Sequence, residues 1–138
     1  WSYLGTDALS IPQSQATMNY GWFTDNTADE EFRRTTVHEF GHAIGLIHEH
    51  QHPRGGIPWD VPKVIEYYRR TQRWDEQQTR SQVLTPTSRT VLQMGGYDPK
   101  SIMHYPVPAQ LLTDRSRAVG WNTDLSEYDK AFVRHAYA

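Results

Sequence analysis

The stretch from residue 38 to residue 48 constrains the fold of this chain most, because it requires a helix and the turn that ends it. It has the pattern H-E-x-x-H-x-x-G-x-x-H. Positions four apart on an α-helix lie on one face, about 6 Å apart along the axis, so His38 and His42 can direct their imidazoles at one ion. Gly45 favours the left-handed backbone that ends a helix, which would turn the chain and bring His48 to the same ion.

Three imidazole ligands leave one coordination position open, which is typical of a catalytic rather than a structural zinc site. Glu39 follows the first ligand and lies beside the ion, where a carboxylate can serve as a general base. The spacing therefore predicts one catalytic Zn²⁺ held by His38, His42 and His48. The alternative is a buried helix whose histidines face solvent or satisfy core hydrogen bonds.

Composition excludes several classes of protein. The 138 residues fit a single domain, 1–138, and the net charge of −2 comes without a basic block, which argues against a nucleic-acid partner. No apolar run approaches the roughly 20 residues that span a bilayer. The chain has no cysteine, which excludes disulfides and thiolate metal ligands. We expect a monomer.

Residue patterns predict four helices. The first, about 28–45, would begin with a capping box at Thr27 and Glu30. Asp60, Asp75 and Ser126 would begin the others, the last two covering about 75–83 and 126–137. Apolar residues at helical spacing are expected to face the core. They are Phe32, Thr36, Phe40, Ala43 and Ile47 in the first helix, Val61, Val64, Ile65 and Tyr68 in the second, and Tyr128, Ala131, Phe132 and His135 in the last.

The rest of the chain is predicted to be extended or irregular. Residues 2–4 are a weak strand candidate, and 17–23 are an aromatic-rich edge-strand candidate, weakened by Asn19 and Gly21. The segments 49–59, 84–100 and 105–124 are rich in Pro, Gly, Thr and Asp and are expected to form loops that wall a site. Within the first of these, His50 and His52 are expected on a solvated rim.

A second motif is Ser101-Ile102-Met103-His104-Tyr105, whose methionine lies 55 residues after His48. Together with the zinc motif and the adjoining Glu49, it resembles the metzincin zinc endopeptidases, in particular the astacin-like group. Trp1-Ser2-Tyr3-Leu4-Gly5 and the segment 124–137 resemble that group more loosely. The lack of cysteine and the sequence 49–53 depart from animal astacins and suggest a distant microbial branch.

The resemblance implies an α+β metzincin-like zincin catalytic domain. A long zinc-binding helix would lie under a small twisted sheet in an upper part, about 1–48. A loop-rich lower part, about 49–138, would end in a helix. The family's first strand, helix and next strand would precede Trp1, and we expect them to be missing from this chain. The resemblance also implies a secreted protein.

The resemblance assigns further roles. Met103 would form an apolar floor beneath the zinc, and Tyr105 would be a catalytic residue and a possible fifth zinc ligand. An upper-rim strand that holds an extended substrate would comprise Met18, Asn19, Tyr20, Gly21 and Trp22. The sequence thus predicts a zinc-dependent endopeptidase with peptide or protein substrates. Two alternatives are a zinc-binding interaction module without turnover and a zinc hydrolase of a non-peptide amide.

Overall fold

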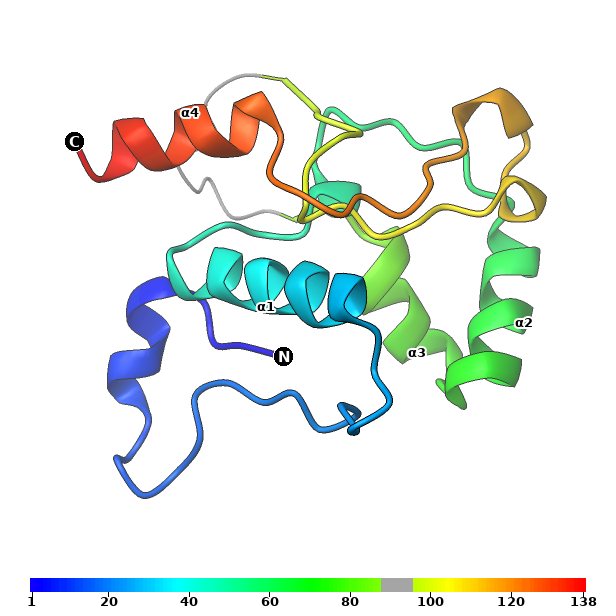
Figure 1. Ribbon diagram of the computed structural model, residues 1–138. Helices are drawn as coiled ribbons and strands as arrows, with labels where there is room; N and C mark the ends of the chain where they lie inside the picture. The colour runs from blue at the N-terminus through cyan, green and yellow to red at the C-terminus, as the bar shows by residue number, and fades with distance from the viewer. Residues whose placement is uncertain (88–95) are drawn as a thin grey trace.

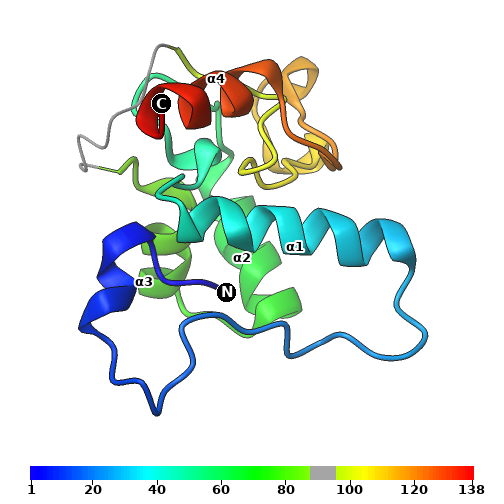
Figure 2. The ribbon, with the colours of Figure 1, turned by 60° about the vertical axis from the view of Figure 1, so that its left-hand side comes forward.

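Helix α1, Asp29–Ala43, runs through the middle of the molecule in the computed structural model, which describes residues 1–87 and 96–138. Residues 1–28 lie along one side of α1, and α4, Glu127–Ala136, lies on the other side (Figure 1). Figure 2, turned by 60°, shows the same order. α2, Val61–Gln72, and α3, Glu76–Thr79, follow in the chain and pack against each other.

Short helical turns complete the described secondary structure. Four are 3-10 turns: η1, Gly5–Ser10; η2, Glu49–Gln51; η4, Ala109–Leu111; and η5, Arg115–Arg117. The fifth, η3, Arg80–Leu84, is a π-helical turn that continues α3. None of the described helices is both long and apolar enough to cross a bilayer.

The four predicted helices are confirmed, with boundaries close to those expected. α1 ends in a Schellman motif, in which Gly45, at φ +97°, donates its N–H to the carbonyl of His42 and Leu46 donates to Gly41. Asp60 accepts a hydrogen bond from the Lys63 N–H at the start of α2. At the other two starts, the side chains of Asp75 and Ser126 accept from Gln78 N and Asp129 N respectively.

The predicted capping box of the first helix is wrong. The N-cap residue is Ala28, which offers no side-chain acceptor, and the Thr27 hydroxyl instead accepts a hydrogen bond from the Thr24 N–H in the preceding turn. Three acidic residues in the first turn, Asp29, Glu30 and Glu31, interact favourably with the positive end of the helix dipole.

The predicted core face of α1 is also wrong. Phe40 is 56% exposed, and Phe32 and Thr36 are only partly buried. The buried residues of α1 are Thr35, His38, Glu39, Gly41 and His42. The face that carries the candidate ligands is therefore the face that packs, because it meets the turn at 101–104. The same error occurs in α4, where Tyr128 and His135 are exposed and the buried residue is Asp129.

The predicted small sheet is not present in the described residues. Residues 1–3 run antiparallel to 17–19, with one isolated bridge between Ser2 and Met18 and hydrogen bonds from Tyr3 N to Thr17 O and from Asn19 N to Trp1 O. The pairing stops there because the chain turns at once: Phe23 N donates to the Tyr20 carbonyl. The two strand candidates thus form an extended pair too short to be strands.

Apolar burial is concentrated in the half of the molecule that follows α1. Val64 of α2, Val83 of η3 and Leu111 of η4 form a cluster, against which partly buried aromatic side chains pack. These are Trp59, Tyr67, Tyr68 and Trp74. A second buried group is provided by Ile102, Met103 and Val107.

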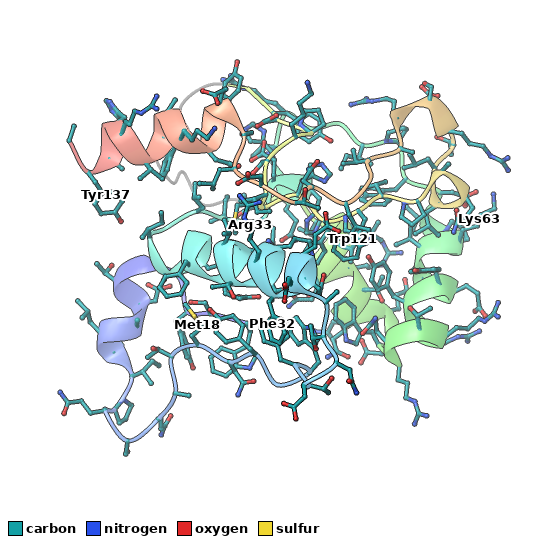
Figure 3. The ribbon with its side chains drawn as sticks, in the orientation of Figure 1. Met18, Phe32, Arg33, Lys63, Trp121 and Tyr137 are labelled. Atoms are coloured by element: carbon teal, nitrogen blue, oxygen red, sulfur yellow. The ribbon has the colours of Figure 1, made fainter. Side chains whose placement is uncertain are left out.

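Polar contacts fix both ends of the α4 segment on α1. Arg33 pairs with Asp124 at 2.7 Å, just before α4, and the Tyr137 hydroxyl donates to the Ile44 carbonyl at 2.8 Å, just after it. Figure 3 shows Arg33 and Tyr137 at these two places and shows Phe32 and Met18 on the other side of α1. There the ring of Phe32 meets that of Phe23 edge to face, 4.5 Å between centroids.

Candidate metal centre

Three histidines from α1 and the segment after Gly45 meet at one point, as the sequence predicts. His38, His42 and His48 each offer a ring nitrogen, and these nitrogens lie within 4.8 Å of one another. The Schellman turn makes this possible, since it redirects the chain within a few residues of the helix end. The cluster could hold one metal ion.

The outer nitrogens of the two helical histidines are held by backbone carbonyls. His38 Nδ1 lies 2.9 Å from Ile102 O, and His42 Nδ1 lies 2.9 Å from Leu46 O. A carbonyl can only accept, so each Nδ1 carries the hydrogen and each Nε2 presents its lone pair inward. His42 Nε2 faces His48 Nε2 at 3.0 Å. Such converging donors fit a divalent cation.

Burial keeps these imidazoles neutral, which is the form that binds a metal. It lowers the pKa of His38 to about 4 and lowers that of His42. It also holds the pKa of His48 well below the usual value, with the charges of neighbouring histidines adding to the effect. Three neutral nitrogen ligands and an adjoining carboxylate match the donor set of a catalytic zinc site.

Glu39 lies beside the cluster and is 6% exposed. Its Oε1 is 3.4 Å from the Trp1 amino group, and its Oε2 is buried with no hydrogen-bond partner among the described atoms. An unsatisfied buried carboxylate oxygen is rare and often marks a functional group. The position of Glu39 suits a base that acts on a group bound next to the ion.

The turn at 101–104 passes beneath the cluster. The His104 N–H donates to Ser101 O at 3.0 Å, and Met103 N donates to the Ser101 hydroxyl oxygen at 3.0 Å. Met103 is 1% exposed, and a Cβ added to Gly41 of α1 would lie 2.5 Å from its Sδ. The lack of a side chain at Gly41 therefore lets the side chain of Met103 pack closely against α1.

Asp129 secures this turn from α4, a role that the sequence did not predict. Its carboxylate accepts from the Ser101 hydroxyl at 2.7 Å, from Ile102 N at 2.9 Å and from Ser126 N at 2.9 Å. Ile102 is also the residue whose carbonyl holds His38. The only signal in the sequence was the spacing of Ser126 and Asp129 as a capping box, which predicts the helix start and not the contact with residues 101 and 102.

Tyr105 lies over the histidines. The centroid of its ring is 4.4 Å from that of His48 and 4.5 Å from that of His50, on which it stacks at 15°. Burial raises the pKa of Tyr105 to about 12, so its hydroxyl stays protonated at neutral pH. A hydrogen-bond donor is thus kept at the edge of the metal centre.

The prediction that His50 and His52 lie on a solvated rim is wrong. They are 4% and 6% exposed. His50 Nε2 lies 2.9 Å from the carbonyl of Gln82, and His52 Nδ1 accepts the N–H of Arg54. Both histidines therefore fasten the chain after the third ligand, and His50 also supports the ring of Tyr105.

Glu49, which follows the third histidine, is structural in this arrangement. Its N–H donates to Met103 O at 3.1 Å, and its Oε1 accepts from Asp98 N at 2.7 Å. Burial, assisted by the charges of Asp98 and Asp129, raises its pKa to about 7. The residue joins the chain after the ligands to the 98–103 region.

Two hollows meet at the metal centre and share Trp22, Glu39 and Tyr105. The first has a volume of about 480 Å³ and runs from His38 toward α2; we call it the aromatic hollow. Its other wall residues include Arg34, Tyr67, Tyr68, Trp74, Trp121 and Pro108. The second has a volume of about 510 Å³; we call it the second hollow. It runs from His42 and His48 past Ser2, Gln51 and Gln82.

The residues expected to form the substrate-binding strand are divided by the structure. Met18 and Asn19 are paired with residues 1 and 2, and the Tyr20 hydroxyl donates to Met18 Sδ at 2.7 Å. Gly21 lies in a turn. Trp22 reaches the metal centre, where it lines both hollows.

The chain is similar in sequence and in structure to two solved structures of myroilysin. The chain is 48% identical to a structure of myroilysin with a TM-score of 0.93, over 99% of this chain and 66% of the other. A crystal structure of myroilysin matches at 49% identity and a TM-score of 0.64, over 99% of this chain and 59% of the other. The chain belongs to the astacin-like metzincins. It spans less than two thirds of either solved chain.

Membership of the astacin-like metzincins agrees with the geometry of the cluster, since a three-histidine zinc site is typical of metzincins. The helical part of that fold is present here, and its small sheet is not seen in the described residues. Scans against protein-family models and against curated proteins found no match.

Proposed function

We propose that this metzincin is a zinc-dependent endopeptidase. The observation that carries the proposal is the place of Glu39, whose unpartnered carboxylate oxygen lies beside three converging imidazoles where two hollows meet. An extended peptide could occupy both hollows and place one peptide bond over Glu39. The likeness to myroilysin supports this reading.

Each residue of the centre has a part in this proposal. His38, His42 and His48 would hold zinc, which supplies an open coordination position, a more acidic bound water and a polarised substrate carbonyl. Glu39 accepts the proton of the attacking water and passes it to the leaving amine.

Tyr105 and Met103 complete the site. The protonated hydroxyl of Tyr105 would donate to the oxygen that becomes negative as water adds to the carbonyl. Tyr105 would also serve as a fifth ligand before substrate binds. Met103 packs beneath the histidines as an apolar filler and takes no part in the chemistry. Trp22 lines both hollows and contacts the substrate from the upper side.

The test is hydrolysis of quenched-fluorescence peptides by the zinc-loaded protein. Glu39→Gln should bind zinc but lower kcat by about 1,000-fold or more, because the base is lost while three ligands remain. Glu30→Gln is the matched control, since Glu30 is an exposed carboxylate of the same helix. Equal cleavage by Glu39→Gln and the wild type would contradict the mechanism.

The same assay separates the two alternatives. Zinc binding with no turnover of any peptide or casein would indicate an interaction module. Turnover of small amides or esters but not of peptides would indicate a hydrolase of non-peptide substrates. Secretion, action as a monomer and a single domain over 1–138 stay predictions.

A further inference from the structure

If the protein is the peptidase proposed above, the aromatic hollow can select which substrate side chain lies beside the scissile bond. It opens directly from the metal centre, because His38, Glu39 and Tyr105 form one of its walls. A side chain next to the scissile bond would therefore enter it. What its remaining walls are made of decides which side chain fits.

The far wall is aromatic and firmly supported. Tyr67 and Tyr68 of α2 and Trp74 after it pack on the cluster of Val64, Val83 and Leu111. The rings of Tyr68 and Trp74 stack at 5.3 Å and 10°. These rings are part of the core on one side and of the hollow on the other, so the hollow keeps its shape without a ligand. Preformed apolar walls favour a large apolar occupant.

The cation Arg34 also lies in the wall, but its charge is neutralised by an ion pair with Glu31. Arg34 donates to Glu31 through Nε at 2.8 Å and Nη2 at 2.7 Å, and Nη2 also lies 3.0 Å from the Thr35 hydroxyl. Its guanidinium carbon is 4.2 Å from the ring centroid of Trp121. A bidentate pair of this kind leaves little attraction for a further carboxylate.

Two acidic side chains, Glu31 and Glu39, also line the hollow. The pKa of Glu31 is held low by its hydrogen bonds from Arg34, so this carboxylate is ionised at neutral pH. An aspartate or glutamate side chain in the hollow would meet two like charges and a neutralised arginine. An aromatic ring would instead meet the faces of tyrosine and tryptophan.

We propose that the aromatic hollow makes this enzyme select peptides with a bulky aromatic or branched apolar residue beside the scissile bond and disfavour an acidic residue there. Trp121 is a specificity-determining residue in this proposal, because it closes the hollow over Arg34. The Glu31–Arg34 pair is a second determinant, because it cancels the positive charge of Arg34, which lines the hollow.

The experiment compares three quenched peptides that differ only at one residue beside the cleaved bond: phenylalanine, glycine or aspartate. Mass spectrometry of the products identifies the bond and the side on which the residue stands. For the wild type we expect kcat/KM for phenylalanine to exceed that for aspartate by about 100-fold, the scale set by burying one aromatic side chain.

Two variants locate the preference in the hollow. Trp121→Ala should lower kcat/KM for the phenylalanine peptide by about 10-fold more than for the glycine peptide, since an aromatic contact is lost. Tyr128→Ala is the matched control, because Tyr128 is similarly exposed, at 58% against 63% for Trp121, and does not line the hollow. Glu31→Gln should shrink the phenylalanine-to-aspartate ratio by about 10-fold, because the charge of Arg34 is released.

The assays separate the side-chain preference of the aromatic hollow from the peptidase activity itself. Cleavage with no preference, or with a preference for aspartate, would overturn the inference and leave the peptidase in place. If no peptide is cleaved, the function is overturned, and calorimetric titration of the Glu39→Gln variant with the same peptides still decides the inference. Equal affinity for the phenylalanine and aspartate peptides would refute it.

Discussion

Gly41 illustrates how a single residue of the zinc helix is constrained by packing. A Cβ at this position would lie 2.5 Å from Sδ and 3.4 Å from Cε of Met103, which is itself 1% exposed. The glycine of the H-E-x-x-H segment is thus required by the neighbouring turn and not by helix formation, which alanine would favour.

The substitution Gly41→Ala should therefore destabilise the protein by about 1–3 kcal/mol, the usual cost of overpacking a filled core. Urea unfolding followed by circular dichroism measures the change. Gly120→Ala serves as the control, since a Cβ there meets nothing within 4 Å. If overpacking is the cause, adding Gly41→Ala to Met103→Ala should cost nothing further; an undiminished loss would point elsewhere.

Tyr105 and His48 have rings 4.4 Å apart, yet their loss should have different consequences. Tyr105→Phe should lower kcat by about 100-fold, the cost of one oxyanion donor, and leave the zinc content unchanged. His48→Ala should lose zinc and activity together, because the two imidazoles that remain are too few to hold the ion. Metal analysis of the dialysed proteins beside the peptide assay checks both. Loss of zinc from Tyr105→Phe would mean that the ligand set is wrong.

At the scale of elements, α4 and the turn beneath the metal centre act as one unit through Asp129. The buried carboxylate accepts three hydrogen bonds, two from residues 101 and 102 and one from its own N-cap residue, Ser126. Since Ile102 also holds His38 through its carbonyl, the start of α4 is connected to the first metal ligand.

This connection predicts that Asp129→Ala costs about 3 kcal/mol of stability, because it leaves two buried donors of the turn without an acceptor. Ser126→Ala removes the cap alone and should cost about 1 kcal/mol. Asp129→Asn keeps one acceptor and should mainly weaken zinc binding, by about 10-fold or more, since the support of His38 is loosened. Urea unfolding and competition with a zinc chelator measure these two effects; unchanged zinc affinity would contradict the link.

The helices could be predicted from the sequence where the deciding contacts are local. Asp60, Asp75 and Ser126 cap helices through bonds to residues three positions ahead, and the sequence records these pairs directly. Thr27 has the same local pattern, but its hydroxyl is engaged by Thr24, so Ala28 takes the cap position. A competing turn one step upstream is invisible to a spacing rule.

The faces of the helices could not be predicted, because they depend on what packs there. Phe40 follows the apolar spacing of α1 yet is exposed, while His38 is buried against the turn at 101–104 and His42 is buried against the turn that follows α1, at Leu46. Periodicity weighs a histidine as polar, but a ligand histidine packs as part of the core. For the same reason the three ligands, whose spacing is local, were predicted, whereas Asp129 and the aromatic hollow join distant segments and were not.

At the scale of the whole molecule, apolar burial is uneven. The buried apolar residues of the described chain all come from between 64 and 112, in α2, η3, η4 and the turns around Met103. α1 meets this half largely through its ligand face, and residues 1–28 meet α1 through η1 and through partly buried aromatic rings. The association of α1 with the rest therefore depends strongly on the polar contacts around its histidines.

Zinc should consequently stabilise the whole molecule and not only the site. A ligand that binds the folded state alone adds RT ln(1 + [L]/Kd), about 4 kcal/mol when its free concentration is a thousand times Kd. Removal of zinc with EDTA should lower Tm by roughly 10 °C or more for a chain of this length. Differential scanning calorimetry with and without EDTA measures the shift, and returning zinc should reverse it.

His48→Ala provides the control, since a variant that cannot hold the ion should melt at the lower temperature, and EDTA should not change its Tm. If the wild type melts identically with and without EDTA, α1 is held by its packing alone, and the histidine cluster makes no contribution to folding stability.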